Sequence, residues 1–187
     1  VVYNKDGKVA ALFIDEAYVD VDEDDVYGVF NTRVSAKTGD DNVYRFTGLI
    51  DGAAFSKKTD DRASAFNGKA GVFGVYKITV DANDVITGVN AIDGTLSPKT
   101  TGVDGVSGKI VGAATISDVN SDRTVITIGS DKYTIADDAV VYKYDNSDEE
   151  FSKGKLASLR KGYTVSLYDT KGKDADGIAT VVIYIED

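Results

Sequence analysis

Three groups of closely spaced carboxylates have the residue types and spacing for ion binding. They are Asp20-Val21-Asp22-Glu23-Asp24-Asp25, the loop Asp145-Asn146-Ser147-Asp148-Glu149-Glu150, and Asp174-Ala175-Asp176-Gly177. Dense carboxylates can supply the roughly six to eight oxygen ligands that calcium takes. The first group resembles the start of an EF-hand loop, but its sixth residue is Asp25 instead of Gly, and no Glu stands at the twelfth position.

Each of these groups also has a plain structural interpretation. The first fits a solvated strand or a linker between repeats, the second an acidic hairpin tip, and the third a β-turn. We therefore assign no metal ligand. Calcium held between repeats, where carboxylates from both sides could meet, stays as the alternative.

The chain has 11 tyrosines, which could stack on sugars if they were exposed. Tyr142 and Tyr144 fall on one face of an expected strand, with Lys143 on the opposite face. Tyr suits strands generally, so we expect these rings to pack in a core or a barrel wall. A pair of carboxylates could in principle hydrolyse a glycoside, but nothing in the sequence indicates the cleft that would hold them.

The composition excludes several classes of protein. The 187 residues carry 21 Lys and Arg against 31 Asp and Glu, a net charge of −10, and contain no Cys, His, Met or Trp. Ser-His-Asp and Cys-His catalysis are therefore ruled out within the chain, as are thiolate metal sites. The acidic balance argues against nucleic-acid binding, and no apolar run is long enough to cross a membrane as a helix. We expect no enzymatic activity and assign no catalytic residue.

The elements that must carry these groups are strands. Asp outnumbers Glu by 26 to 5, Gly is frequent, and residues 72–80, 163–167 and 181–185 alternate apolar and other side chains. Asp51-Gly52, Asn83-Asp84 and Asp176-Gly177 predict hairpin turns. Residues 155–161, ended by Gly162, predict a single helical turn that caps a barrel end.

The chain contains two diverged copies of one unit. VYGVF at residues 26–30 matches VSGKI at 106–110, and the following strands, Asp-Asp pairs and closing hairpins recur in the same order. Between its Asp pair and its next Gly the second copy is about 14 residues longer, since (162 − 138) − (71 − 61) = 14. The extra segment includes residues 140–144 and the acidic loop.

We divide the chain into four parts on this repeat. Residues 1–16 are the hairpin strand of a preceding repeat or the leading strand of the first unit, 17–93 the first barrel repeat, 94–105 a linker, and 106–187 the second barrel repeat. The expected fold is all-β, with two tandem small barrels, OB-like or SH3-like, of five to six strands each; Ig-like sandwiches are the alternative. The polar linker predicts flexibility between the barrels.

Two segments resemble the β-rich repeats of surface-layer (S-layer) proteins of Gram-positive bacteria. They are SDRTVITIGSDKYTIADDAVVYKYD at residues 121–145 and KLASLRKGYTVSLYDTKGKDADGIATVVIYIED at 155–187. The resemblance covers residues 104–187 well and 18–93 more loosely. It implies an extracellular location on the bacterial cell surface, next to S-layer homology domains that bind cell-wall polymers. This sequence contains no such domain, and the resemblance assigns no catalytic residue.

The sequence thus predicts a non-enzymatic structural module that acts in spacing, display or lattice packing. Its expected partners are neighbouring repeats or like subunits, without nucleic acid and without membrane insertion. The alternative is a module that binds cell-wall polymers or other glycans. Because the chain starts at Val1 and lacks Met, we also expect it to be a fragment of a longer protein.

Overall fold

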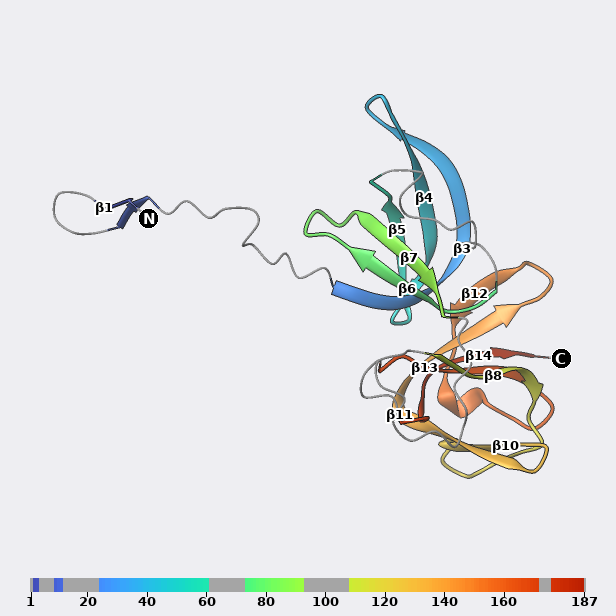
Figure 1. Ribbon diagram of the computed structural model, residues 1–187. Helices are drawn as coiled ribbons and strands as arrows, with labels where there is room; N and C mark the ends of the chain where they lie inside the picture. Colours follow the sequence, from blue (N-terminus) through green and yellow to red (C-terminus); the bar gives the residue numbers. More distant parts are fainter. Residues whose placement is uncertain are drawn as a thin grey trace.

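The computed structural model describes residues 2–3, 9–11, 24–60, 73–92, 108–171 and 176–186, with side chains from residue 26 onward (Figure 1). Strands account for most of these residues. A single turn of 3-10 helix, η2 (Leu156–Ser158), is the one helical element among them. The all-β prediction is therefore confirmed. The expected linker, residues 94–105, lies outside the described residues.

The first sheet has five strands in the order β5-β4-β3-β6-β7. They are β3 (Asp24–Thr38), β4 (Asp41–Ile50), β5 (Ala53–Lys58), β6 (Tyr76–Val80) and β7 (Ile86–Ala91). All neighbours are antiparallel, and the sheet curls until a parallel bridge joins Thr59 to Ile86. A separate two-stranded sheet pairs β1 (Val2–Tyr3) with β2 (Val9–Ala11).

The second sheet has seven strands in the order β8-β13-β14-β11-β10-β9, with β12 also paired to β11. They are β8 (Gly108–Thr115), β9 (Asp118–Val119), β10 (Val125–Ile128), β11 (Asp131–Asp145), β12 (Glu150–Lys153), β13 (Thr164–Asp169) and β14 (Ala179–Ile185). The one parallel pair joins β11 to β14, from Ile135 opposite Ala179 to Tyr144 opposite Ile185.

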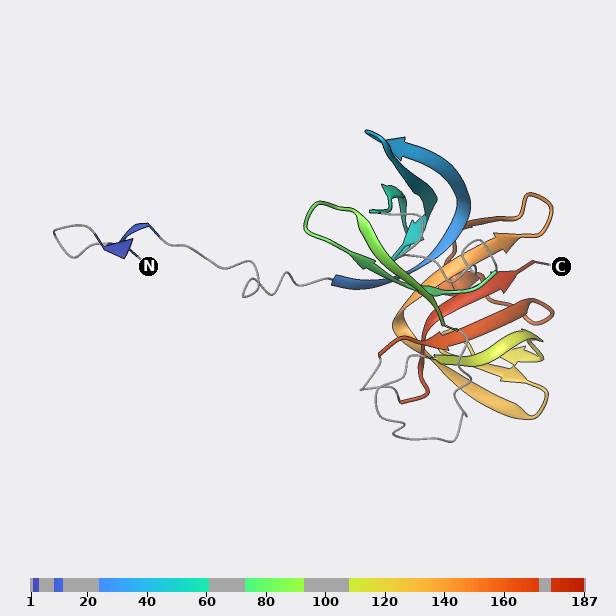
Figure 2. The same ribbon diagram turned by 45° about the horizontal axis from the view of Figure 1, so that its top comes forward.

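Figure 2 shows the two curled sheets, the first in blue to green and the second in yellow to red. They share one connectivity once β8 and β9 are taken together as a divided first strand. In each sheet the first strand lies between the second and the fourth, and the third meets the fifth in parallel. This is a five-stranded barrel of the OB type, in which closure leaves few free edges. The predicted barrel-like architecture is confirmed, and the pairing differs from the two facing sheets of an Ig-like sandwich.

The predicted turns at Asp51-Gly52 and Asn83-Asp84 are confirmed, whereas the segment before Asp176-Gly177 lies partly outside the described residues. Asp51 and Gly52 both have positive φ, 49° and 75°, as a two-residue type I′ hairpin requires. The carboxylate of Asp81 accepts backbone N–H bonds from Asn83 at 2.9 Å and Val85 at 2.8 Å, which fixes the β6–β7 turn.

Each barrel encloses a core of its own. Phe30, Phe46, Tyr76, Ile78, Ile86 and Val89 fill the first barrel, where Phe30 lies with its ring centroid 4.7 Å from that of Phe46. In the second barrel, Leu159 follows η2 and is fully buried among residues of β8, β11, β13 and β14. The predicted helical turn therefore does cap a barrel end.

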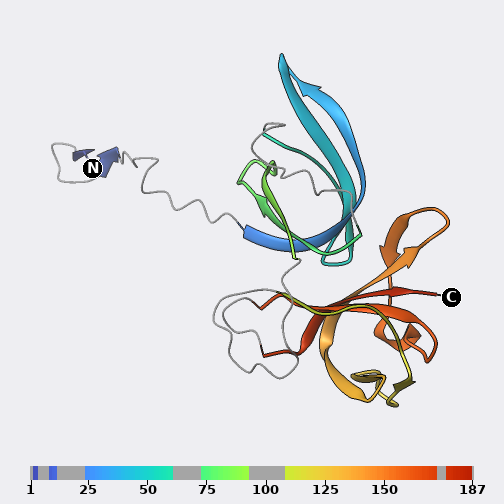
Figure 3. The same cartoon turned by 45° about the vertical axis from the view of Figure 1, so that its right-hand side comes forward.

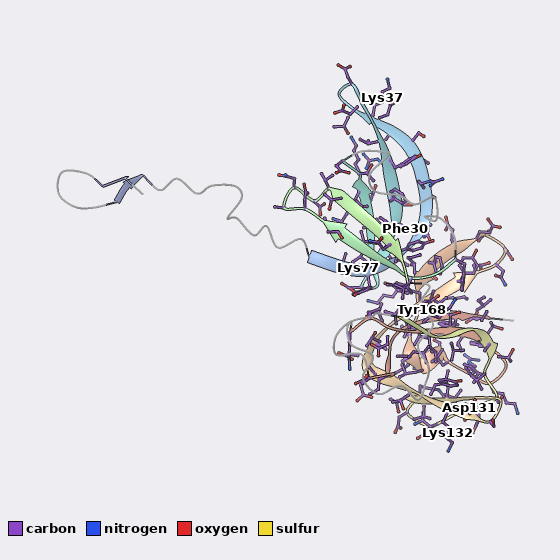
Figure 4. All side chains as sticks on the ribbon, viewed as in Figure 1. Phe30, Lys37, Lys77, Asp131, Lys132 and Tyr168 are labelled. Carbon is purple, nitrogen blue, oxygen red and sulfur yellow. The ribbon has the colours of Figure 1, made fainter. Side chains whose placement is uncertain are left out.

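A third apolar cluster lies between the barrels. It joins Val29, Leu49, Val75 and Ile92 of the first barrel to Tyr142, Phe151, Tyr168, Val181 and Ile183 of the second. The two barrels are stacked on this cluster, with Tyr168 labelled at their contact in Figure 4. The polar linker led us to expect no large apolar interface between the barrels, and the structure shows one. Flexibility between the barrels stays a prediction, and this interface argues against it.

Candidate functional site

The contact between the barrels combines apolar packing with hydrogen bonds between distant parts of the chain. It covers the outer faces of β13 and β14, whose inner faces are buried in the core of the second barrel. In β14, Val182 and Tyr184 pack into the core of the second barrel, whereas Val181 and Ile183, on the opposite face, pack into the contact. Strands that are apolar on both faces need cover on both, and the first barrel supplies the outer cover.

A β-hairpin of the second barrel reaches across to the first. In this arm, residues 142–153, the end of β11 pairs with β12 in antiparallel register from Tyr142 opposite Lys153 to Asp145 opposite Glu150. Figure 3 shows the arm rising from the lower barrel beside β3 and β4. The arm lies in the segment by which the second copy is longer than the first.

A side-chain amide of the first barrel holds the arm. Asn31 sits at a register shift in β3, between Phe30 and Thr32. Its Nδ2 donates to the carbonyl of Phe151 at 3.0 Å, and its Oδ1 accepts from the backbone N–H of Phe151 at 2.7 Å. The amide thus pairs with β12 as a neighbouring strand would, and the bulge turns it toward the arm.

Replacing Asn31 tests whether its two hydrogen bonds to Phe151 stabilise the protein. We expect Asn31→Asp to lower the free energy of unfolding by about 1–3 kcal/mol, because a carboxylate cannot donate to the Phe151 carbonyl and leaves it unpaired. Asn90→Asp is the matched control, since it makes the same charge change at an exposed strand position. Urea unfolding measures both. Equal stabilities of the two variants would show that the amide pairing contributes nothing.

Two buried tyrosine hydroxyls complete the contact. The hydroxyl oxygen of Tyr142, from β11, lies 3.4 Å from the backbone N–H of Gly52, which donates to it. Burial is the main cause that raises the pKa of Tyr142 well above 10.0. Tyr168 on β13 is hydrogen-bonded to the backbone of Val75, and burial raises its pKa from 10.0 to about 12. Both groups are therefore neutral at the contact near neutral pH.

These pKa shifts predict that the pair of barrels loses stability in alkali. Folding keeps the Tyr168 hydroxyl protonated, so its contribution is complete below pH 10, where the unfolded chain also keeps its proton, and is lost as the pH rises toward 12. At about 1.4 kcal/mol per pKa unit, Tyr168 alone accounts for roughly 2–3 kcal/mol. Thermal melts at pH 8 to 12 should show a smaller alkaline loss for Tyr168→Phe than for the native chain. Identical losses would contradict the shift.

The aromatic rings near the arm pack against one another. Tyr144 lies with its ring centroid 4.7 Å from that of Phe151 and 4.9 Å from that of Phe73. Tyr142 is fully buried, and none of the tyrosine side chains in the described ranges is classed as exposed. The expectation that Tyr142 and Tyr144 pack in the structure is therefore met: Tyr142 is wholly enclosed, and Tyr144 is partly buried against the cluster between the barrels.

The carboxylate groups have local roles where the structure describes them. Residues 20–23, 174 and 175 lie outside it, and only the backbone of Asp24 and Asp25 is described, within β3. The loop 145–150 is a hairpin tip, as predicted. The Asp145 carboxylate accepts the backbone N–H of Ser147 at 2.8 Å, and such bonds lower its pKa.

Asp169, the most deeply buried carboxylate among the described residues, lies in none of the three carboxylate groups. Asp169 has no exposed surface, and its oxygens accept backbone N–H bonds from Lys171, Asp176 and Gly177 at 2.9–3.1 Å. It organises the β13–β14 turn as Asp81 organises the β6–β7 turn. Its position in the repeat, equivalent to that of Asp81, is the signal that could have identified it.

A hollow of about 410 Å³ opens where the arm leaves the second barrel beside the first. Asp51 and Gly52 line it from the first barrel; Asp137, Asp138, Lys153 and Lys155 are among its residues from the second. Carboxylates from both barrels thus line the same hollow, and Lys153 and Lys155 line it as well. Within the described residues, however, no three carboxylates group closely enough to hold a metal ion.

Comparison with known proteins identifies no relative. No protein-family model, no curated protein and no solved structure matches this chain. No helix among the described residues is long and apolar enough to cross a membrane.

Proposed function

We propose that this chain is a non-enzymatic structural module of a bacterial cell-surface protein of the S-layer type. Its role is to hold two barrels at a fixed separation and orientation, so that neighbouring parts of a surface array are spaced. The partners of such a module are adjacent repeats or like subunits.

The observation that supports this role is the contact between the barrels. Nine buried apolar residues form a cluster between the barrels, and the Asn31 side-chain amide is hydrogen-bonded to the hairpin arm. Domains joined only by a flexible linker need neither feature. Interfaces that are apolar and closely packed suppress the relative motion that is otherwise the default for linked domains. The arm also lies in the segment by which the second copy is longer than the first in sequence.

Glycan binding, the alternative function, lacks support in the described surface. Exposed tyrosines beside Asp or Asn side chains would favour this function. Among the described residues, the tyrosines are buried or half-buried, and Phe73, 36% exposed, is the one exposed aromatic ring. The Phe73 ring packs against Tyr144 in an edge-to-face contact and against Phe151 in a tilted one.

A binding assay separates these two functions. The purified chain is incubated with a glycan array and with sedimented Gram-positive cell walls, and bound protein is measured over a concentration series. A spacing module should give no saturable binding to either. Saturable binding to one glycan class would overturn the proposal in favour of the alternative.

A further inference from the structure

The route of the chain through the second barrel determines how that barrel meets a pulling force. β8 and β14 both pair antiparallel with β13, so they run parallel to each other on its two sides. Gly108, at the start of β8, pairs with Asp169; Ile185, at the end of β14, pairs with Thr164. The chain therefore enters and leaves at opposite ends of β13.

Tension applied at these two points slides β8 and β14 past β13 in opposite directions. Backbone hydrogen bonds of antiparallel strands lie perpendicular to the strands, so they carry such a load together instead of breaking one by one. β14 is also held on its other side, by parallel pairs with β11 from Ile135 to Tyr144. Sliding β14 therefore requires both of its edges to shear.

The first barrel repeats this geometry. β3 and β7 flank β6, and both are antiparallel to it. Asp24 pairs with Val80 at one end of β6, whereas Ala91 pairs with Tyr76 at the other. The chain again enters and leaves at opposite ends of the central strand, so tension along the chain shears this barrel as well.

From this topology we infer that both barrels are tension-bearing units, built to resist a pull along the chain. The inference deepens the proposed structural role and rests on it for its biological meaning. The function it adds is mechanical: the module transmits force between its neighbours without unfolding. Resistance to a pull depends on the barrier to unfolding, which the direction of loading changes even when stability does not.

Single-molecule force spectroscopy on the full chain tests the inference in one barrel. Because the chain has no Cys, two engineered cysteines define the points of attachment. The pair Lys109→Cys and Glu186→Cys loads the second barrel in shear, from the start of β8 to beyond the end of β14. The pair Lys161→Cys and Glu186→Cys pulls at the one end where Thr164 meets Ile185, so β13 and β14 unzip.

We expect a several-fold higher rupture force for the shear pair than for the unzipping pair at the same loading rate. Melting temperatures of the two variants, measured without force, must agree for this comparison. If the melting temperatures differ, the native chain is instead pulled at its two ends, which also loads the barrels in shear. Its rupture force should again be several-fold higher than that of the unzipping pair. Equal rupture forces would overturn the inference. They would not affect the proposed spacing role, which the binding assay tests separately.

Discussion

Phe151→Ala is expected to separate the unfolding of the two barrels. The Phe151 ring is 5% exposed and lies within the cluster that joins the barrels. Its removal leaves a cavity that should cost about 3–5 kcal/mol, as Phe→Ala substitutions in packed cores do. The native chain should unfold in one transition, because the contact couples its halves, and the variant should show two.

Differential scanning calorimetry measures this effect, with Val34→Ala as the control. Val34 is 51% exposed on the first barrel, so its truncation should change stability by less than about 0.5 kcal/mol. A Phe151→Ala variant that keeps a single transition and loses less than about 1 kcal/mol would show that this ring does not couple the barrels.

Gly48→Ala is expected to prevent β3 and β4 from pairing as they do. A Cβ atom at residue 48 would lie 2.0 Å from the carbonyl oxygen of Val29 and 2.9 Å from the Cα of Phe30. Both obstacles are backbone, so no side-chain movement relieves them. We expect a loss of about 3 kcal/mol or more, beyond ordinary overpacking, and it should fall on the first barrel.

The matched control is Gly112→Ala in the second barrel. There the nearest atoms to a new Cβ belong to the flexible Lys109 side chain, at 3.3 Å, and can move. Its stability in urea should stay within about 0.5 kcal/mol of the native value. Hydrogen exchange then locates the damage of Gly48→Ala, which should appear as lost protection in β3 and β4. Undiminished protection there would contradict the close approach of the two backbones.

Much of each barrel is predictable because its signals are local. Turns such as Asp51-Gly52 and the capping turn before Leu159 follow from residue types at short spacing. The order of the strands follows the repeat, since equivalent strands pair in equivalent ways in the two sheets.

The contact between the barrels was not predictable in the same way. Asn31 and Phe151 are 120 residues apart, and neither has a neighbour in sequence that indicates the other. The length of the second copy indicates an extra segment, but nothing in the sequence indicates that this segment contacts β3 and β4. One signal was present and interpreted otherwise: residues 181–185 are all apolar or aromatic, which indicates burial on both faces and not the alternation of a half-buried strand.

The distance between the barrels, measured by double electron–electron resonance, tests the central claim most directly. The chain has no Cys, so spin labels at Ser35→Cys and Ser130→Cys, exposed positions on the first and second barrels, are the only labels present. A rigid pair predicts one narrow distance distribution, which Phe151→Ala broadens. A broad distribution in the otherwise native chain would contradict the claim that the two barrels act as one body.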